Sequence, residues 1–158
     1  MPLSASDRAA LWPALPTLPV HWAALPGGGV PLPGGLRLVA GDAPDGTPYL
    51  RATLHASEDF AELLDGRGDY TEEELDDPDA VMEERWVTAQ AALATALAQA
   101  APVLGEPART ASAPGGRVHW LLADRTVSLG LQQADRDCPI ELCLWLLPPG
   151  HTPESLEL

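Results

Sequence analysis

Carboxylates are the side chains of this chain whose number and spacing could perform chemistry. Thirteen of the twenty-seven residues in Glu58–Glu84 are acidic, and a single one, Arg67, is basic. The twelve positions from Asp65 to Asp76 match a calcium-binding loop in length only. Arg67 and Tyr70 occupy its third and sixth positions, where an oxygen ligand and a glycine are needed. The segment therefore predicts a strongly negative surface and no defined metal site.

The histidines and cysteines lack the spacing of metal or catalytic motifs. The four histidines are scattered, without an i, i+4 pair: His21, His55, His119 and His151. His119 adjoins Trp120 in an expected strand, so we expect a structural role for it. Cys138 and Cys143 would lie roughly 16 Å apart on an extended strand, too far for a disulfide. We therefore expect reduced thiols, a cytoplasmic location, and neither metal nor cofactor.

Motifs for nucleophilic catalysis and phosphate binding are also missing from the sequence. No serine lies in a Gly-x-Ser-x-Gly elbow. The glycine run Gly27-Gly28-Gly29 is followed by Val30-Pro31 and not by the lysine and hydroxyl of a phosphate-binding loop. The tripeptide Arg67-Gly68-Asp69 is explained by turn chemistry. We therefore predict no catalytic residue and a protein that is not an enzyme, with an enzyme of unrecognised site as the third alternative.

The overall charge restricts the class of partner. The 158 residues carry 9 basic and 23 acidic side chains, a formal net charge of −14. Such a chain repels nucleic-acid phosphates and anionic lipid, so we expect neither direct nucleic-acid binding nor membrane binding. A basic protein partner is favoured electrostatically, although the charge could instead serve solubility alone. The absence of Lys and Asn indicates a GC-rich, bacterial genome.

The first half of the chain predicts an N-terminal arm followed by a hairpin. Seven prolines in residues 1–35 exclude a long helix there, but a short helix is expected at about Ser6–Trp12. The arm is too apolar to remain free, so it should pack on a single domain spanning 1–158. Leu36–Ala40 and Tyr49–His55 flank turn-forming residues and predict two antiparallel strands.

Helices are predicted between the hairpin and residue 101. Ser57 should cap a short helix that Gly66 ends, and Asp77-Pro78 should begin a long helix running from about 78 to 101. Its core face is expected to carry large side chains at helical spacing: Met82, Trp86, Leu93 and Leu97. A second face carries small ones: Val87, Ala94, Ala98 and Ala101.

This second face suggests a partner for the long helix. No charge occurs from Trp86 to Gly105, although a helix packed by one face should be charged on its back. We therefore expect another element to cover it: the arm, the short helix, or the same helix of a second subunit in a homodimer. Because this run contains no eighteen successive apolar residues, we expect no transmembrane helix.

Three strands are predicted in the last third of the chain. Arg117–Ala123, Thr126–Gln133 and Ile140–Leu147 form a meander after a loop at Glu106–Gly116, and residues 148–158 form a tail. The fold class is α+β, with one antiparallel sheet of about five strands and helices packed on a face. Several of these strands also carry apolar side chains on a second face, so we expect that face of the sheet to be partly buried too. Any exposed apolar strand surface and the tryptophans should supply affinity for a partner.

The small size, the acidity, the apolar long helix and the proline-rich arm resemble, in architecture, the type III secretion chaperone-like proteins. This resemblance implies a homodimer that holds a client protein without chemistry. We therefore expect a non-enzymatic acidic adaptor or chaperone-like protein that binds a basic protein. Its contact residues would be acids of the cluster: Glu72, Glu73, Glu74, Asp76, Asp77, Asp79, Glu83 and Glu84. The alternative is an immunity or antitoxin protein that neutralises a basic toxin such as a nuclease.

Overall fold

The protein folds as an open antiparallel sheet with helices on one face. The computed structural model describes residues 5–58, 76–110 and 116–158. The sheet has seven strands in the order β1-β2-β3-β7-β6-β5-β4. Their bounds are Val30–Pro31 (β1), Arg37–Asp42 (β2), Pro48–Ala56 (β3), Ala108–Thr110 (β4), Arg117–Leu121 (β5), Thr126–Gln132 (β6) and Glu141–Leu147 (β7). The α+β class is confirmed, whereas the prediction of about five strands is wrong: β1 and β4, with two and three residues, extend the edges.

The predicted hairpin is β2–β3, and the predicted meander is β5–β6–β7. The hairpin turn closes through Ala43 N–H donating to the Thr47 carbonyl at 2.8 Å. The Asp45 carboxylate accepts from Thr47 N–H at 2.8 Å, and Gly46 adopts φ 87°, which a side chain would disfavour. Strand β7, the last in sequence, lies between β3 and β6 in the middle of the sheet.

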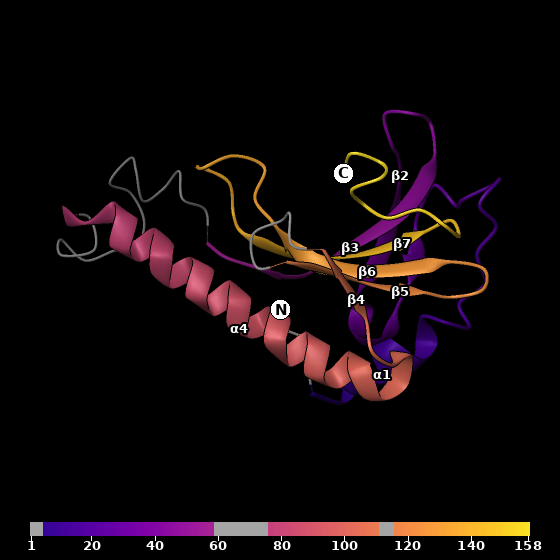
Figure 1. Cartoon of the computed structure of the whole chain (residues 1–158), viewed down its shortest axis with the longest axis horizontal. Coiled ribbons are helices and arrows are strands. Elements are labelled where there is room, and N and C mark those ends of the chain that lie inside the picture. The colour runs from indigo at the N-terminus through magenta and orange to yellow at the C-terminus, as the bar shows by residue number, and fades with distance from the viewer. Residues whose placement is uncertain (1–4, 59–75, 111–115) are drawn as a thin grey trace.

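Two described α-helices lie on the same side of this sheet (Figure 1). They are α1 (Ala5–Ala14) and α4 (Pro78–Leu104), and a 3₁₀ turn, η1 (Pro33–Gly35), follows β1. The Asp77 carboxylate caps α4 by accepting from Ala80 N–H at 3.1 Å. The helix continues three residues past its expected end at 101 and stops at Gly105, whose N–H donates to the Ala101 carbonyl at 2.9 Å. The predicted short helix after Ser57 lies outside the described residues.

The buried stripe of α4 is rich in alanine: Val81, Ala89, Leu93, Ala96 and Ala100. The expected core face is therefore partly wrong. Leu93 is buried, but Met82, Trp86 and Leu97 are half-buried at the edge of the stripe. The helix is rotated because small alanines allow its backbone to approach the sheet, and alanine carries a weak hydrophobic signal in the sequence.

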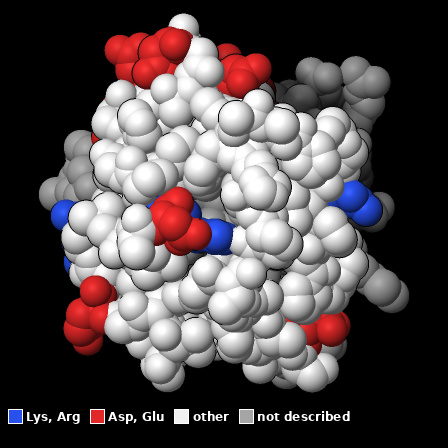
Figure 2. Space-filling view, turned by 90° about the vertical axis from the view of Figure 1, so that its right-hand side faces the viewer, with Lys and Arg blue, Asp and Glu red and all other residues white. Residues whose placement is uncertain are grey.

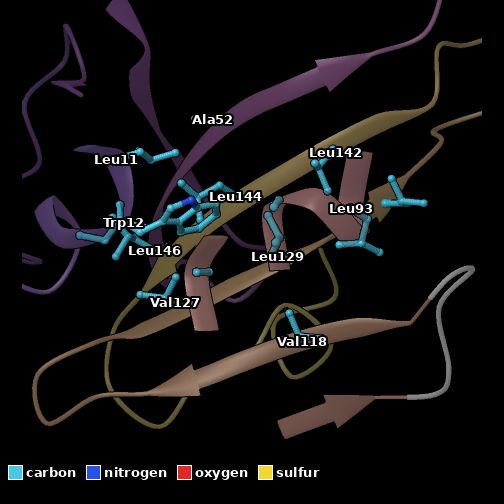
Figure 3. Packing of buried hydrophobic residues seen from close by; sticks show 14 of the residues in the cluster. Leu11, Trp12, Ala52, Leu93, Val118, Val127, Leu129, Leu142, Leu144 and Leu146 are labelled. Carbon is cyan, nitrogen blue, oxygen red and sulfur yellow. The ribbon is translucent and has the colours of Figure 1, made fainter. Parts of the chain in front are cut away.

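The main core fills the space between the helices and the sheet. Figure 3 shows Leu11 and Trp12 of α1 packed with Leu144 and Leu146 of β7. Both α1 side chains are 1% exposed, so part of the N-terminal arm belongs to the core. The arm continues to contact the domain further along, because the Trp22 indole N–H donates to the Asp124 carbonyl at 3.4 Å.

The opposite face of the sheet is covered by the C-terminal segment, residues 148–158 (Figure 1). Leu156 is 3% exposed and packs with Cys143, Trp145 and Leu147 of β7. The prediction that this second face is partly buried is therefore confirmed, and the apolar side chains of β7 are not available for binding. Of the five tryptophans, Trp12, Trp120 and Trp145 are buried, and Trp22 and Trp86 are half-buried.

Helix α4 is, by length and composition, apolar enough to cross a membrane, unlike any other helix in the described residues. This differs from the expectation from the sequence, because Thr and Gln interrupt the apolar run without adding charge. A helix of a protein core passes the same test. Helix α4 packs on the sheet through Ala89, Leu93 and Ala96, and 22% of its apolar window is buried.

Candidate functional site

The first candidate site is the acidic end of α4, which we define as Asp76, Asp77, Asp79, Glu83 and Glu84. All five side chains are exposed. Asp77 also caps the helix, and Asp79 forms an ion pair of 2.5 Å with Arg136 of the loop before β7. The other predicted contact residues, Glu72, Glu73 and Glu74, lie outside the described residues.

This end of α4 extends beyond the sheet, away from the end where α1 packs (Figure 1). Figure 2 shows the molecule from that other end, where a few acidic and basic groups are scattered over a largely uncharged surface. At the beginning of α4, by contrast, five exposed acids fall within residues 76–84. Asp76, Glu83 and Glu84 have no ion pair within the described part of the chain.

The second candidate surface is the alanine face of α4, defined as Val87, Ala94, Ala98 and Ala101. Val87 is 59% exposed, Ala94 and Ala98 are exposed, and Ala101 is half-buried. Helix α1 packs against α4, and Val87, Ala94 and Ala98 remain exposed. At 100° per residue, Glu83 and Val87 point in similar directions one turn apart, so the acidic end and the alanine face adjoin along one side of the helix.

The third feature is a cavity of about 580 Å³ between α1, α4 and β3. From α1 it is lined by Arg8, Leu11 and Trp12, and from β3 by residues 53–56. Helix α4 supplies Ala91, Ala92, Thr95, Ala96 and Gln99, and β7 supplies Leu142. The wall is therefore largely apolar, with a few polar groups, which is typical of sites for small organic molecules.

A β-bulge shapes the wall of this cavity at β3. Thr53 pairs with Cys143, and His55 pairs with the next residue of β7, Leu142, so Leu54 is an extra residue. Leu142 belongs to the core on the helix side, so its partner His55 faces that side too. Leu54 also packs against this core. The bulge thus places two successive side chains on the helix side, where regular alternation would place one.

On the opposite face, His119 joins a buried polar cluster. Its Nδ1 lies 2.9 Å from the Ser128 hydroxyl, and its Nε2 lies 3.3 Å from a carboxylate oxygen of Glu154. Burial, opposed by Glu154 and assisted by Arg117, lowers the pKa of His119. The order serine–histidine–carboxylate is that of a hydrolase triad. Ser128 is fully buried, however, and its hydroxyl also lies 3.2 Å from the Val118 carbonyl, so this cluster is structural.

A second polar group on the same face surrounds the buried thiol of Cys143. Arg51 donates to Glu141 at 2.7 Å and lies 3.0 Å from the Cys143 sulfur. Burial raises the pKa of Cys143, and the hydrogen bond and charge of Arg51 oppose this only in part. The thiol is therefore protonated near neutral pH and is a poor nucleophile. Both cysteines are free.

No cluster of three or more His, Cys, Asp or Glu side chains in the described ranges could hold a metal ion. The sequence reasoning also missed the cavity. The spacing of Arg8 and Trp12, i and i+4 on the first helix, was a readable signal that both share a face. The bulge at Leu54 left no comparable signal, because it depends on pairing with a strand about ninety residues away.

Fold and surfaces together define a small α+β protein with an open antiparallel sheet, two described helices and an exposed charged helix end. Comparison with family models, with curated proteins and with solved structures finds no match for this chain. Its function is therefore inferred from its own geometry.

Proposed function

We propose that this protein is a non-enzymatic adaptor or chaperone-like protein that docks a basic protein partner on the acidic end of α4. One observation supports this most directly. Exposed acids on the first turns of α4 run without interruption into an exposed, uncharged face of the same helix. Such a surface attracts a cationic partner at long range and offers Val87 as an apolar contact beside the charges.

The same helix supports a homodimer through its alanine face. Small side chains allow two helices to approach closely, and this part of α4 carries no charge that would be desolvated. An antiparallel arrangement places the acidic end of each α4 beside the uncharged C-terminal half of its partner. A parallel arrangement would oppose the two sets of acids, which costs free energy through like-charge repulsion. We therefore propose an antiparallel dimer with an acidic end exposed at either side.

Charge reversal at matched positions tests the docking proposal. The variant Asp76→Lys/Glu83→Lys/Glu84→Lys reverses three exposed acids of the acidic end but keeps the capping Asp77. The control Asp42→Lys/Glu106→Lys/Asp137→Lys reverses three exposed acids elsewhere and produces the same net charge. Basic proteins captured from the native cytosol by the unmodified chain supply the partner for kinetic measurements.

With that partner, the association rate of the first variant should fall by about tenfold or more at low salt, and its salt dependence should flatten. The control should retain most of the rate and of the salt dependence. If both triple variants lose the same amount, attraction depends on net charge alone and the assigned surface is wrong. An unchanged rate in the first variant would contradict the proposal directly.

A further inference from the structure

The cavity between α1, α4 and β3 has polar groups that the docking function does not use. The indole Nε1 of Trp12, which forms part of its wall, is buried and has no hydrogen-bond partner in the described structure. Leaving a buried N–H unpaired costs about 1–3 kcal/mol. Trp12 itself is 1% exposed, so bulk water does not satisfy this donor. The same burial keeps an acceptor atom of a ligand in the cavity from reaching it.

Arg8 adds a positive charge to the same wall. It lies one turn before Trp12 on the same face of α1 and lines the cavity. Arg8 is half-buried and forms no ion pair or hydrogen bond with the described residues. Among the residues that the structure describes, no Asp or Glu lines this cavity. Its electrostatics therefore favour an anion.

The remaining wall is suited to an apolar body. Leu11, Leu54 and Leu142 contribute hydrocarbon surface, and alanines of α4 leave the space open. The volume of about 580 Å³ lies within the range of roughly 300–1,000 Å³ found for small-molecule sites. Thr95 and Gln99 lie on the α4 side and offer further hydrogen bonds to a polar head group.

We propose that this cavity binds a small amphipathic carboxylate, with its apolar body among the leucines and its head group near Arg8. This inference goes beyond the docking of a protein partner, and it does not depend on it. The guanidinium of Arg8 pairs with the carboxylate. The bulge at Leu54 holds one apolar and one imidazole side chain against the ligand from β3.

Octanoate is the probe, and octan-1-ol is its uncharged counterpart of equal chain length. Isothermal titration of the full chain should show one saturable site for octanoate. Arg8→Gln should weaken octanoate binding by about tenfold, as loss of a charge-assisted hydrogen bond implies, and change octan-1-ol binding by less than about twofold. Arg109→Gln, an exposed arginine on β4, is the control and should leave both affinities unchanged.

A filled cavity provides a second, independent test. Thr95 lines the cavity, whereas Thr88 lies one heptad earlier on α4, is exposed and does not line it. Thr95→Phe should reduce octanoate affinity by about tenfold or more, whereas Thr88→Phe should not, and circular dichroism should show both variants folded. Absence of saturable octanoate binding by the unmodified chain would overturn the proposal. So would equal affinity in Thr95→Phe, or an Arg8→Gln effect that is the same for octan-1-ol.

Discussion

The guanidinium of Arg117 lies over the indole ring of Trp145, 5.0 Å from the ring centroid. The two residues come from β5 and β7 and face the C-terminal segment. Arg117 also donates through Nη1 to the main-chain oxygen of Leu158 at 3.0 Å. A single side chain therefore connects the sheet to the segment that covers it, and it does so from an environment where Arg117 is 8% exposed.

Replacement of this arginine should destabilise the fold. Arg117→Met keeps an apolar side chain but loses the cation–π contact and the hydrogen bond to Leu158, so the free energy of unfolding should fall by about 1–3 kcal/mol. Urea denaturation followed by tryptophan fluorescence measures this loss. Arg109→Met, at an exposed position of β4, is the control and should change stability by less than about 0.5 kcal/mol. Equal effects of the two variants would contradict the role of Arg117.

Gly130 leaves the space that the Arg117 side chain occupies. A Cβ at residue 130 would lie 2.6 Å from Cγ of Arg117, so Gly130→Ala should displace that side chain and cost about 1–3 kcal/mol. Gly28→Ala, where a Cβ meets nothing within 4 Å, is the matched control. In the Arg117→Met background the cost of Gly130→Ala should shrink, because the thioether side chain is more easily displaced. If the free-energy costs of the two substitutions simply add in the double variant, this explanation is refuted.

The buried imidazole of His119 should make stability depend on pH. Because its native pKa lies below the ordinary 6.5, chiefly through burial, the unfolded chain takes up a proton first as the pH falls. The stabilisation that depends on a neutral His119 is complete above pH 6.5. It is lost as the pH drops through 6.5 towards the pKa of His119 in the native protein. Unfolding free energies measured from pH 7.5 to 5.5 should decline less steeply in His119→Leu than in the unmodified chain. Replacement of the exposed His21 by Gln should not make this decline of the unfolding free energy with pH less steep.

The two cysteines should differ in reactivity. Cys143 is 0% exposed and its pKa is raised by burial, whereas Cys138 is half-buried in the loop before β7. One thiol per chain should therefore react readily with a disulfide reagent at pH 8, and two should react in denaturant. Cys138→Ser should abolish the fast reaction of the native protein. Retention of a fast thiol in that variant would show that Cys143 is accessible.

The alanine face predicts the mass of the protein in solution. Light scattering at micromolar concentrations should give twice the chain mass of 16.7 kDa. Ala98→Glu places a charge within the proposed contact and should return the chain mass. Thr88→Glu, on another side of the same helix, should leave the dimer intact. If the unmodified protein instead has the mass of a single chain, the proposed dimer is wrong.

Much of the fold followed from local patterns. The alternation Val127, Leu129, Leu131 in β6 predicts its strand, and Asp77-Pro78 predicts the start of α4, because both signals depend on neighbouring residues. The strand order could not be predicted, since the choice of β3 as a partner for β7 depends on contacts about ninety residues apart. The two additional edge strands are too short to show a period.

The candidate sites also differ in whether the local sequence predicts them. The acidic end of α4 is visible as a local excess of charge, and its described members are exposed as a charge cluster requires. The cavity became visible only with the structure, because its wall combines one helix face, one strand bulge and small side chains of another helix. Sequence spacing placed Arg8 and Trp12 together but gave no reason to bring Leu54 opposite them.

The central position of β7 has a consequence for biosynthesis. Strand β3 finds its main partner only when residues 141–147 have been made, so the nascent hairpin β2–β3 carries an unpaired inner edge until then. Such long-range pairing slows folding and leaves apolar strands open to association with other chains. A ribosome-bound chain that stops before β7 should therefore need shielding by cellular holdases, and release of the last segment should complete folding in a single cooperative step.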